Sequence, residues 1–182
     1  SIVSPDGFVG LVAGDQVLLQ SEGSRILVEA GRTEGREVVT HGVTQSGQID
    51  AGGGSAVLAA GDLYSVAITQ SGQLTAREIR VQSEGAGDVV ISGTLDATSK
   101  TAGERGGSVL VTGDRVGVLA GAMIDASGPA GGGQILVGGD FQGANPEVRN
   151  SRVTLVARDA TLRADATAQG GGGRVIVWSD DT

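Results

Sequence analysis

The stretch GGGQILVGGD, residues 131–140, joins glycines, a short apolar segment and a final Gly-Asp pair. Two close copies occur, GGSVLVTGD at 106–114 and GGSAVLAAGD at 53–62, and a shorter one, GLVAGD, lies at 10–15. Self-similarity of this kind is typical of repeat proteins, in which each repeat is one small structural unit. The sequence therefore predicts a stack of similar units.

The acidic residue after each apolar run gives the period of the repeat. The aligned residues are Asp15, Asp62, Asp114, Asp140 and, from VIVWSD, Asp180. The last regular interval, from Asp114 to Asp140, is 26 residues, and the 52 residues between Asp62 and Asp114 are twice that value. An irregular copy at 77–93 fills the longer interval. We therefore expect about 20 to 30 residues per copy.

Each copy contains three short segments with the two-residue alternation of a strand that buries one face. In the first segment, Val57 and Ala59 are predicted to point inward. The second segment follows the aligned acidic residue, and Val17 and Leu19 are assigned to it in the first copy. The third segment has the pattern x-[Ile/Leu]-x-Ala, found in QIDA, QLTA, TLDA, MIDA and TLRA.

These segments predict an all-β fold, a parallel β-helix with three short strands per coil. One copy cannot bury its inward side chains alone, whereas stacked copies cover one another. Long helices are not expected, because each glycine in a helix interior costs about 1 kcal/mol relative to alanine. An antiparallel sandwich and a β-propeller are the alternatives, but neither predicts a three-strand unit that returns near 26 residues.

Length and charge narrow the class of protein further. The 182 residues are enough for one domain with a core, and we expect a single domain over 1–182. The formal net charge is -8, and the 13 basic residues are scattered, which argues against a nucleic-acid partner. The chain has no cysteine, so disulfides and cysteine-ligated zinc are excluded.

One stretch interrupts the pattern. After Asp140 the expected second strand is replaced by FQGANPEVRNSR, residues 141–152. The following interval exceeds a 26-residue coil by about 14 residues, which predicts a protruding loop, and binding residues concentrate on loops. No other interruption of this kind is expected. The candidate interaction residues in the loop are Phe141, Asn145, Glu147, Arg149 and Asn150.

Three other groups of residues are candidates for chemistry. Trp178 is placed outward by the alternation, as an exposed aromatic that could stack on a sugar ring or cover an end of the stack. The aligned aspartates of neighbouring coils would match the carboxyl spacing of a glycosidase, or could bind calcium, but a role in turns is the simpler interpretation. His41 is expected in a surface turn. We predict no metal and no cofactor.

The chain resembles filamentous haemagglutinin-type exoproteins, the secreted partners of bacterial two-partner secretion systems. The resemblance is carried by residues 106–128, 131–150 and 160–182, and more weakly by GFVGLVAGDQVLLQ at 7–20. It implies a right-handed β-helix within a large extracellular protein that is exported through an outer-membrane β-barrel transporter. The NPNL and NPNG signatures of the family's secretion domain are missing, so we expect a segment downstream of that domain.

The resulting functional expectation is a structural and interaction role, not an enzymatic one. A rigid segment of a secreted adhesin, located at the bacterial cell surface, would attach to a host-cell or surface glycan or protein receptor. A β-helical polysaccharide lyase or hydrolase, and a passive spacer of a contact-dependent toxin exoprotein, are the alternatives. Unpaired strand edges at the terminal coils also predict end-to-end association of the isolated segment.

Overall fold

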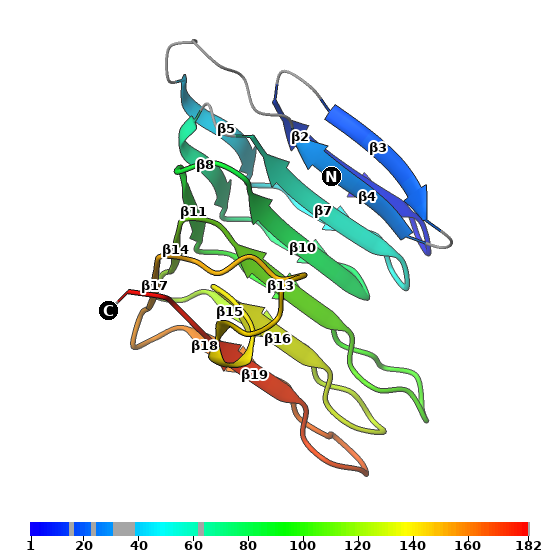
Figure 1. Cartoon of the computed structure of the whole chain (residues 1–182). Helices are drawn as coiled ribbons and strands as arrows, with labels where there is room; N and C mark the ends of the chain where they lie inside the picture. The colour runs from blue at the N-terminus through cyan, green and yellow to red at the C-terminus, as the bar shows by residue number, and fades with distance from the viewer. Residues whose placement is uncertain (15–16, 23–24, 31–38, 62–63, 182) are drawn as a thin grey trace.

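The computed structural model describes residues 1–14, 17–22, 25–30, 39–61 and 64–181. Three parallel sheets run along its length, and each of the first five coils adds one strand to each sheet, whereas the last adds one strand to two of them (Figure 1). The prediction of an all-β parallel β-helix with three strands per coil is confirmed. Registered residues on neighbouring coils lie 25 positions apart for Gln45 and Gln70, and 27 for Asp88 and Arg115.

We number the sheets in the order in which the chain enters them. Sheet 1 contains β1 (Ile2–Val3), β6 (Gln48–Asp50), β9 (Gln73–Thr75), β12 (Thr94–Asp96), β15 (Met123–Asp125) and β18 (Thr161–Arg163). Sheet 2 contains β2 (Phe8–Ala13), β7 (Ser55–Ala60), β10 (Glu78–Ser83), β13 (Ser108–Thr112), β16 (Gln134–Val137) and β19 (Arg174–Val177). Sheet 3 contains β5 (Val39–Gln45), β8 (Tyr64–Gln70), β11 (Asp88–Ile91), β14 (Arg115–Val118) and β17 (Val153–Val156).

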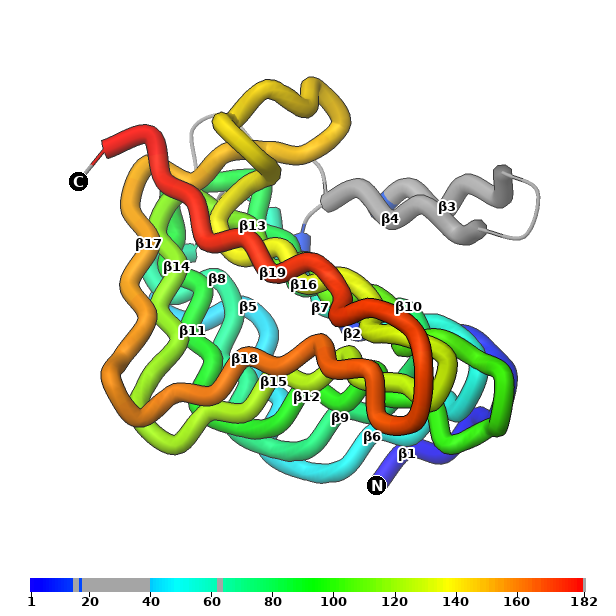
Figure 2. The backbone as a smooth tube through the Cα atoms, turned by 90° about the horizontal axis from the view of Figure 1, so that it is seen from below, coloured from blue at the N-terminus to red at the C-terminus, as the bar shows by residue number. Residues whose placement is uncertain are grey.

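The coil is right-handed. Figure 2 looks along the axis with the last coil nearest the viewer, and the chain turns counterclockwise through β17, β18 and β19 as it approaches. This is the usual hand for connections between parallel strands, because strand twist favours it.

The core is a set of apolar ladders inside the three sheets. The third-segment pattern is confirmed in sheet 1, where residues in register on successive coils are buried together: Ile49, Leu74, Leu95 and Ile124. Each is followed two residues later by a buried alanine at the narrow corner toward sheet 2: Ala51, Ala76, Ala97 and Ala126. Small side chains at that corner let the chain turn without leaving a void.

A column of glycines lines the same corner just before sheet 2. Gly107 and Gly133 lie one above the other, and the backbone N–H of Gln134 donates to the Gly107 carbonyl at 3.0 Å. A Cβ atom on Gly133 would overlap that carbonyl oxygen and lie 2.6 Å from the Gly106 carbonyl carbon. Glycine is needed here because neighbouring coils approach through their backbones.

The inward assignment of Val57 and Ala59 is wrong by one residue. In β7 the residues paired with the buried Ile79 and Val81 of β10 are Ala56 and Leu58. The reason is that β7 has six residues before Gly61, whereas β13 has five before Gly113, which shifts the Gly-Asp reference point by one. Val57 and Ala59 therefore lie on the outer face of sheet 2, where they are nevertheless buried.

The assignment of Val17 and Leu19 to a coil strand is also wrong. They lie in β3 (Val17–Glu22), which pairs antiparallel with β4 (Arg25–Ala30) as a hairpin outside the coil. β4 contacts β2 and β7 of sheet 2, and the hairpin forms a separate two-stranded sheet. The second strand of the first coil is β5 instead. Strand alternation alone does not distinguish a hairpin strand from a coil strand, because both have a two-residue period.

The hairpin also corrects the expectation of a single interruption. It leaves the coil between β2 and β5, and the stretch 138–152 leaves it between β16 and β17. Both excursions therefore open at the corner between sheet 2 and sheet 3. Asp15 and Asp62, two of the aligned aspartates, lie outside the described residues.

Candidate functional site

Residues 138–152, which we call the extruded loop, project from the coil on the outer side of sheet 2 (Figure 2). The loop begins at Gly138 and Gly139, whose φ angles are 77° and 151°. Glycine adopts such angles at little cost, so the pair lets the chain leave β16 sharply. A short 3-10 turn, η1 (Phe141–Gly143), follows.

Asp140 organises the first half of the extruded loop. The residue is only 6% exposed, and its carboxylate accepts hydrogen bonds from the Phe141 N–H at 2.6 Å and from Asn145 Nδ2 at 2.9 Å. Arg174 of β19 donates to the same carboxylate at 2.5 Å. The bonds from Asn145 and the Phe141 N–H, assisted by the Arg174 charge, hold the pKa of Asp140 below its usual value. The Asp140 carboxylate is therefore held in place by three donors of the protein itself.

Asn145, Arg149 and Asn150 shape the loop from within. The Asn145 side-chain oxygen accepts the Glu147 N–H at 3.1 Å, and Asn150 Nδ2 donates to the Gly143 carbonyl at 3.1 Å. The Arg149 guanidinium reaches back across the sheet and donates to the Ser83 carbonyl at 2.5 Å and the Gly85 carbonyl at 3.2 Å.

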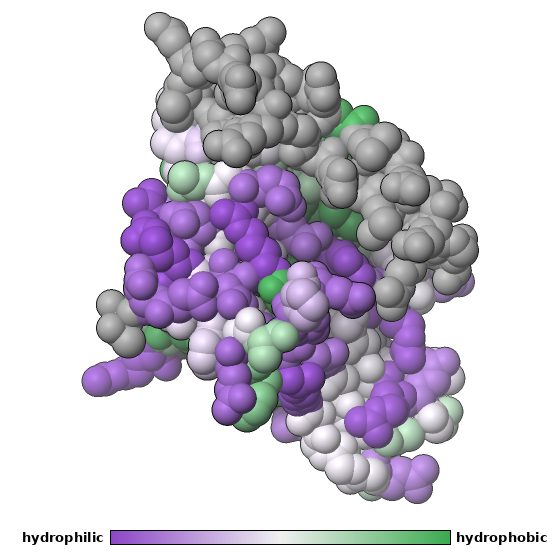
Figure 3. All heavy atoms as spheres, viewed as in Figure 1, coloured by the Kyte–Doolittle hydropathy of each residue, from purple (hydrophilic) through white to green (hydrophobic). Residues whose placement is uncertain are grey.

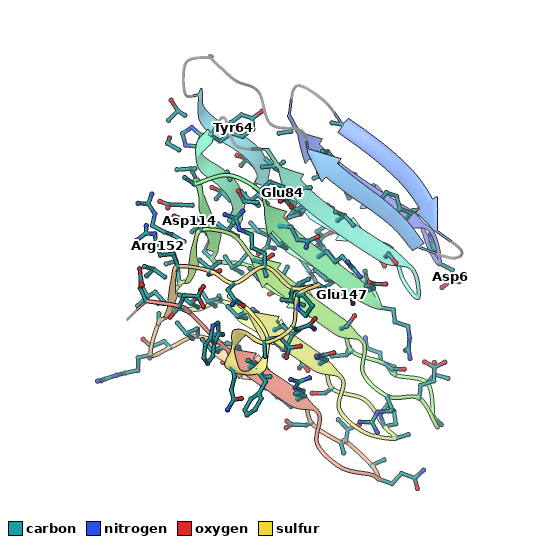
Figure 4. The ribbon with its side chains drawn as sticks, viewed as in Figure 1. Asp6, Tyr64, Glu84, Asp114, Glu147 and Arg152 are labelled. Atoms are coloured by element: carbon teal, nitrogen blue, oxygen red, sulfur yellow. The ribbon has the colours of Figure 1, made fainter. Side chains whose placement is uncertain are left out.

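The Arg149 bonds anchor the loop two coils away from its origin, because Ser83 ends β10 whereas the loop starts after β16. Three of the five candidate interaction residues thus hold the loop in place. The other two face solvent: Phe141 is 61% exposed, and Glu147 is exposed and lies over the middle of the outer face of sheet 2 (Figure 4). Phe141 and Glu147 are therefore the residues that the loop offers to a partner.

Trp178 is half-buried and does not stand free in solvent. Its indole lies against Gly139 and Gly143, where an added Cβ would come within 2.8 Å and 2.9 Å of ring atoms. Its Nε1 donates to the Asp180 carboxylate at 3.0 Å. The side chain packs under the base of the extruded loop, and the missing side chains of the two glycines make room for it.

A groove runs along the outer face of sheet 2 beside the extruded loop. One part, of about 430 Å³, lies between the loop and the strands β10, β13 and β16, with Asn145, Glu147 and Val148 on the loop side. The other part, of about 900 Å³, follows the glycine corner, where Arg77 and Arg105 project. Figure 3 shows this face of the molecule. Both parts are lined by Glu78, Ser108 and Gln134, so we treat them as one axial groove.

The three aligned aspartates that the structure describes, Asp114, Asp140 and Asp180, do not form one common site. Asp114 pairs with Arg152 at 3.2 Å, whereas Asp140 and Asp180 have the different partners given above. Asp140 has the predicted role in a turn, since it accepts the Phe141 N–H at the start of η1. A second series has the same role: Asp50, Asp96 and Asp125 each accept the N–H two residues later at 2.9 Å. These aspartates are the last residues of three sheet 1 strands, β6, β12 and β15.

In the described part of the chain, no group of three histidine or acidic side chains is placed to hold a metal ion. None of the helices found there has the length and apolar character needed to cross a membrane. His41 is exposed on β5, in register with Val66.

Comparison with known proteins gives no family assignment. No protein-family model matches the chain, and no curated protein shows significant sequence similarity to it.

Proposed function

We propose that this chain is a rod-forming segment of a secreted bacterial adhesin of the filamentous haemagglutinin type, and that its extruded loop and axial groove contact the attached surface. The observation that carries the proposal is a loop that leaves the fifth coil, is anchored on the third, and exposes Phe141 and Glu147. A loop fixed in this way presents its contacts at low entropic cost.

The coil is suited to a mechanical role. Every described coil is joined to its neighbours by parallel strand pairing, and inward side chains such as Leu95 and Ile79 are completely buried. Repeats that contact only their neighbours build an extended, stiff object whose length grows with the number of coils. Such an object holds a binding loop away from the surface that carries it.

The secreted location and the outer-membrane β-barrel transporter in this proposal follow from the sequence resemblance. The absence of cysteine is compatible with export of an unfolded chain, because no disulfide can form before export. A test is secretion of a gene fusion of this segment to the family's secretion domain, with and without the transporter gene.

The charges beside the loop favour binding over catalysis. A general acid needs a raised pKa, whereas that of Asp140 is lowered and its carboxylate already accepts three donors. Glu78, the carboxylate shared by both parts of the groove, is paired with Arg80 at 2.7 Å. These contacts are what a structural carboxylate makes, and they support the adhesin over a polysaccharide-degrading enzyme.

The test is attachment of the purified segment to host cells and to a glycan array, with released sugar ends measured in the same wells. Phe141→Ala should weaken attachment several-fold, because it removes the most exposed apolar side chain of the loop. Leu155→Ala is the matched control, since Leu155 is 59% exposed but lies on β17 in sheet 3. Attachment without cleavage supports the adhesin.

Two outcomes contradict the proposal. Release of sugar ends that disappears in Glu147→Gln would indicate the enzyme instead. Neither attachment nor cleavage would leave the passive spacer of a toxin exoprotein as the function.

We also propose that the isolated segment associates end to end. Val175 and Val177 of β19 are in register with the buried Ile135 and Val137 of β16, yet they are exposed. Their burial by a second copy would remove apolar surface from water. Sedimentation velocity should show a concentration-dependent increase in mass, and a constant monomer over a wide concentration range would refute the association.

A further inference from the structure

The floor of the axial groove carries a polar row that follows the axis of the coil. Ser55, Glu78, Ser108 and Gln134 are the first residues of four successive strands of sheet 2, and each is in register with the next. Their side chains are half-buried on the outer face. Because neighbouring strands lie about 4.8 Å apart, the row offers one hydrogen-bonding side chain at each step of that length.

Apolar surface lies directly beside this row. Two positions further along the same strands, Leu110 and Leu136 also face outward and line the groove, and Val148 of the extruded loop lines it from above. The groove therefore combines a line of donors and acceptors with a short aliphatic patch over β13 and β16, whereas the equivalent position of β10 is Arg80. A ligand that is polar along one edge and apolar on its face fits this arrangement.

The charges in the groove are largely paired within the protein. Glu78 is bonded to Arg80, and Asp140 to Arg174. On the glycine side, Arg77 is bonded to Glu104 at 3.3 Å, and Arg105 donates to the Gly132 carbonyl at 2.9 Å. Asp6, Arg105 and Glu147 form no ion pair with another described residue, but the charged side chains that line the groove nearly balance: three arginines (Arg77, Arg80, Arg105) face four carboxylates (Asp6, Glu78, Asp140, Glu147). With three positive charges against four negative ones, the groove therefore has a net charge of only -1, against -8 for the whole chain. An uncharged ligand suits it better than a phosphate or a carboxylate polymer.

We propose that the axial groove binds a linear, neutral, β-1,4-linked glycan that lies parallel to the axis of the coil. A pyranose residue in an extended β-1,4 chain advances by nearly the coil spacing, so each sugar can meet the next member of the row. Its hydroxyl groups bond to Ser55, Glu78, Ser108 and Gln134, and its C–H faces pack on Leu110 and Leu136. This inference rests on the proposed adhesin function and names its ligand class.

An extended peptide fits the same surface less well. It advances about 3.3 Å per residue, out of step with the coil spacing, and it gains most of its affinity from the free edge of a sheet. The axial groove lies over the face of sheet 2, where strands β7, β10, β13 and β16 are each paired on both sides. The groove therefore offers side chains and no backbone edge.

The test is isothermal titration calorimetry with β-1,4-glucan oligosaccharides of increasing length, from the disaccharide to the hexasaccharide. Affinity should rise with each added sugar and level off near four, where the row has been filled. Gln134→Ala should weaken binding of the longest oligosaccharide about threefold to tenfold, since one hydrogen bond contributes about 0.5–1.5 kcal/mol. Gln73→Ala is the matched control, because Gln73 is an exposed glutamine in sheet 1, away from the groove. The affinity of this variant for the hexasaccharide should stay within twofold of that of the parent protein.

The outcomes separate this inference from the adhesin function. If cells are bound but none of the glucans is, or if Gln134→Ala and Gln73→Ala bind the hexasaccharide equally, the glycan groove is refuted and the adhesin stands. Preference for polygalacturonate over the neutral glucan would also refute the stated class. If the glucan is bound but cells are not, the groove stands and the adhesin function fails.

Discussion

Replacing Gly133 by alanine tests whether the coils are held at their spacing by direct backbone contact. The φ angle of Gly133 is not in the left-handed region, so alanine causes no conformational strain there. The cost is purely steric. An added Cβ would lie 2.6 Å from the Gly106 carbonyl carbon and closer still to the Gly107 carbonyl oxygen, whereas ordinary contacts begin at 3.4 Å.

The size of the effect follows from these distances. Since backbone atoms cannot rotate away as a side chain can, the two coils must separate locally by at least about 0.8 Å, the shortfall at the Gly106 carbonyl carbon alone. The hydrogen bond from the Gln134 N–H to the Gly107 carbonyl would then lengthen from 3.0 Å to at least about 3.8 Å and be lost. Overpacking costs about 1–3 kcal/mol and a lost hydrogen bond about 0.5–1.5 kcal/mol. We therefore expect the free energy of unfolding to fall by about 2–4 kcal/mol.

The measurement is urea unfolding followed by far-ultraviolet circular dichroism, with Gly171→Ala as the control. Gly171 belongs to the next glycine run, but an added Cβ there would meet no heavy atom within 4 Å. Alanine at 171 should leave stability unchanged or raise it by up to about 1 kcal/mol, because it restricts the unfolded chain. If the two variants unfold with free energies equal to within about 0.5 kcal/mol, the backbone-contact explanation is wrong.

Three further predictions concern the core and the extruded loop. Leu95→Ala, in the middle of the sheet 1 ladder, should lower the free energy of unfolding by about 2–5 kcal/mol in the same urea assay. The reason is that the substitution leaves a cavity in the core, and the coils above and below keep that cavity from collapsing. Arg149→Ala should speed proteolytic cleavage within 138–152 with little change in the unfolding midpoint of the coil, since it removes the bonds that anchor the loop; unchanged cleavage would contradict that role. The folded-state pKa of Asp140 lies below its ordinary value of 3.8, so the stability that this carboxylate contributes is complete above that pH and is lost as the pH falls through the lowered pKa. Asp140→Asn should therefore be less stable than the parent near neutral pH and should lose less stability on acidification below 3.8, as measured by urea midpoints across a pH series.

The repeating elements of the fold are predictable from the sequence because they depend on local patterns. The x-[Ile/Leu]-x-Ala segments fall on sheet 1 in register, since inward apolar residues and corner alanines are needed in every coil. Counting the inward positions of a strand back from the Gly-Asp pair is less reliable. The extra residue before Gly61 moved the prediction for β7 to the wrong face, because the side-chain period of a strand is two.

The features that departed from the sequence prediction depend on contacts between distant segments. The β3–β4 hairpin has the same alternation as a coil strand, and only its antiparallel pairing reveals it. The contact of Arg149 with the Ser83 carbonyl spans 66 residues and involves a backbone group, which leaves no signal in the identity of Ser83. The half-burial of Trp178 depends on Gly139 and Gly143, which belong to the extruded loop of the preceding coil and contact the indole ring.

The placement of both excursions at one corner has a consequence for how this architecture can diversify. The opposite corner, from sheet 3 to sheet 1, is only two residues long in three successive coils, as Ser-Gly at 46–47, 71–72 and 92–93. The corner from sheet 2 to sheet 3 holds a whole hairpin in one coil and a 15-residue loop in another without disturbing the pairing of the strands on either side. A lineage could therefore exchange its recognition parts at that corner while keeping its scaffold, and an engineer could graft a foreign epitope in place of 141–148 for the same reason.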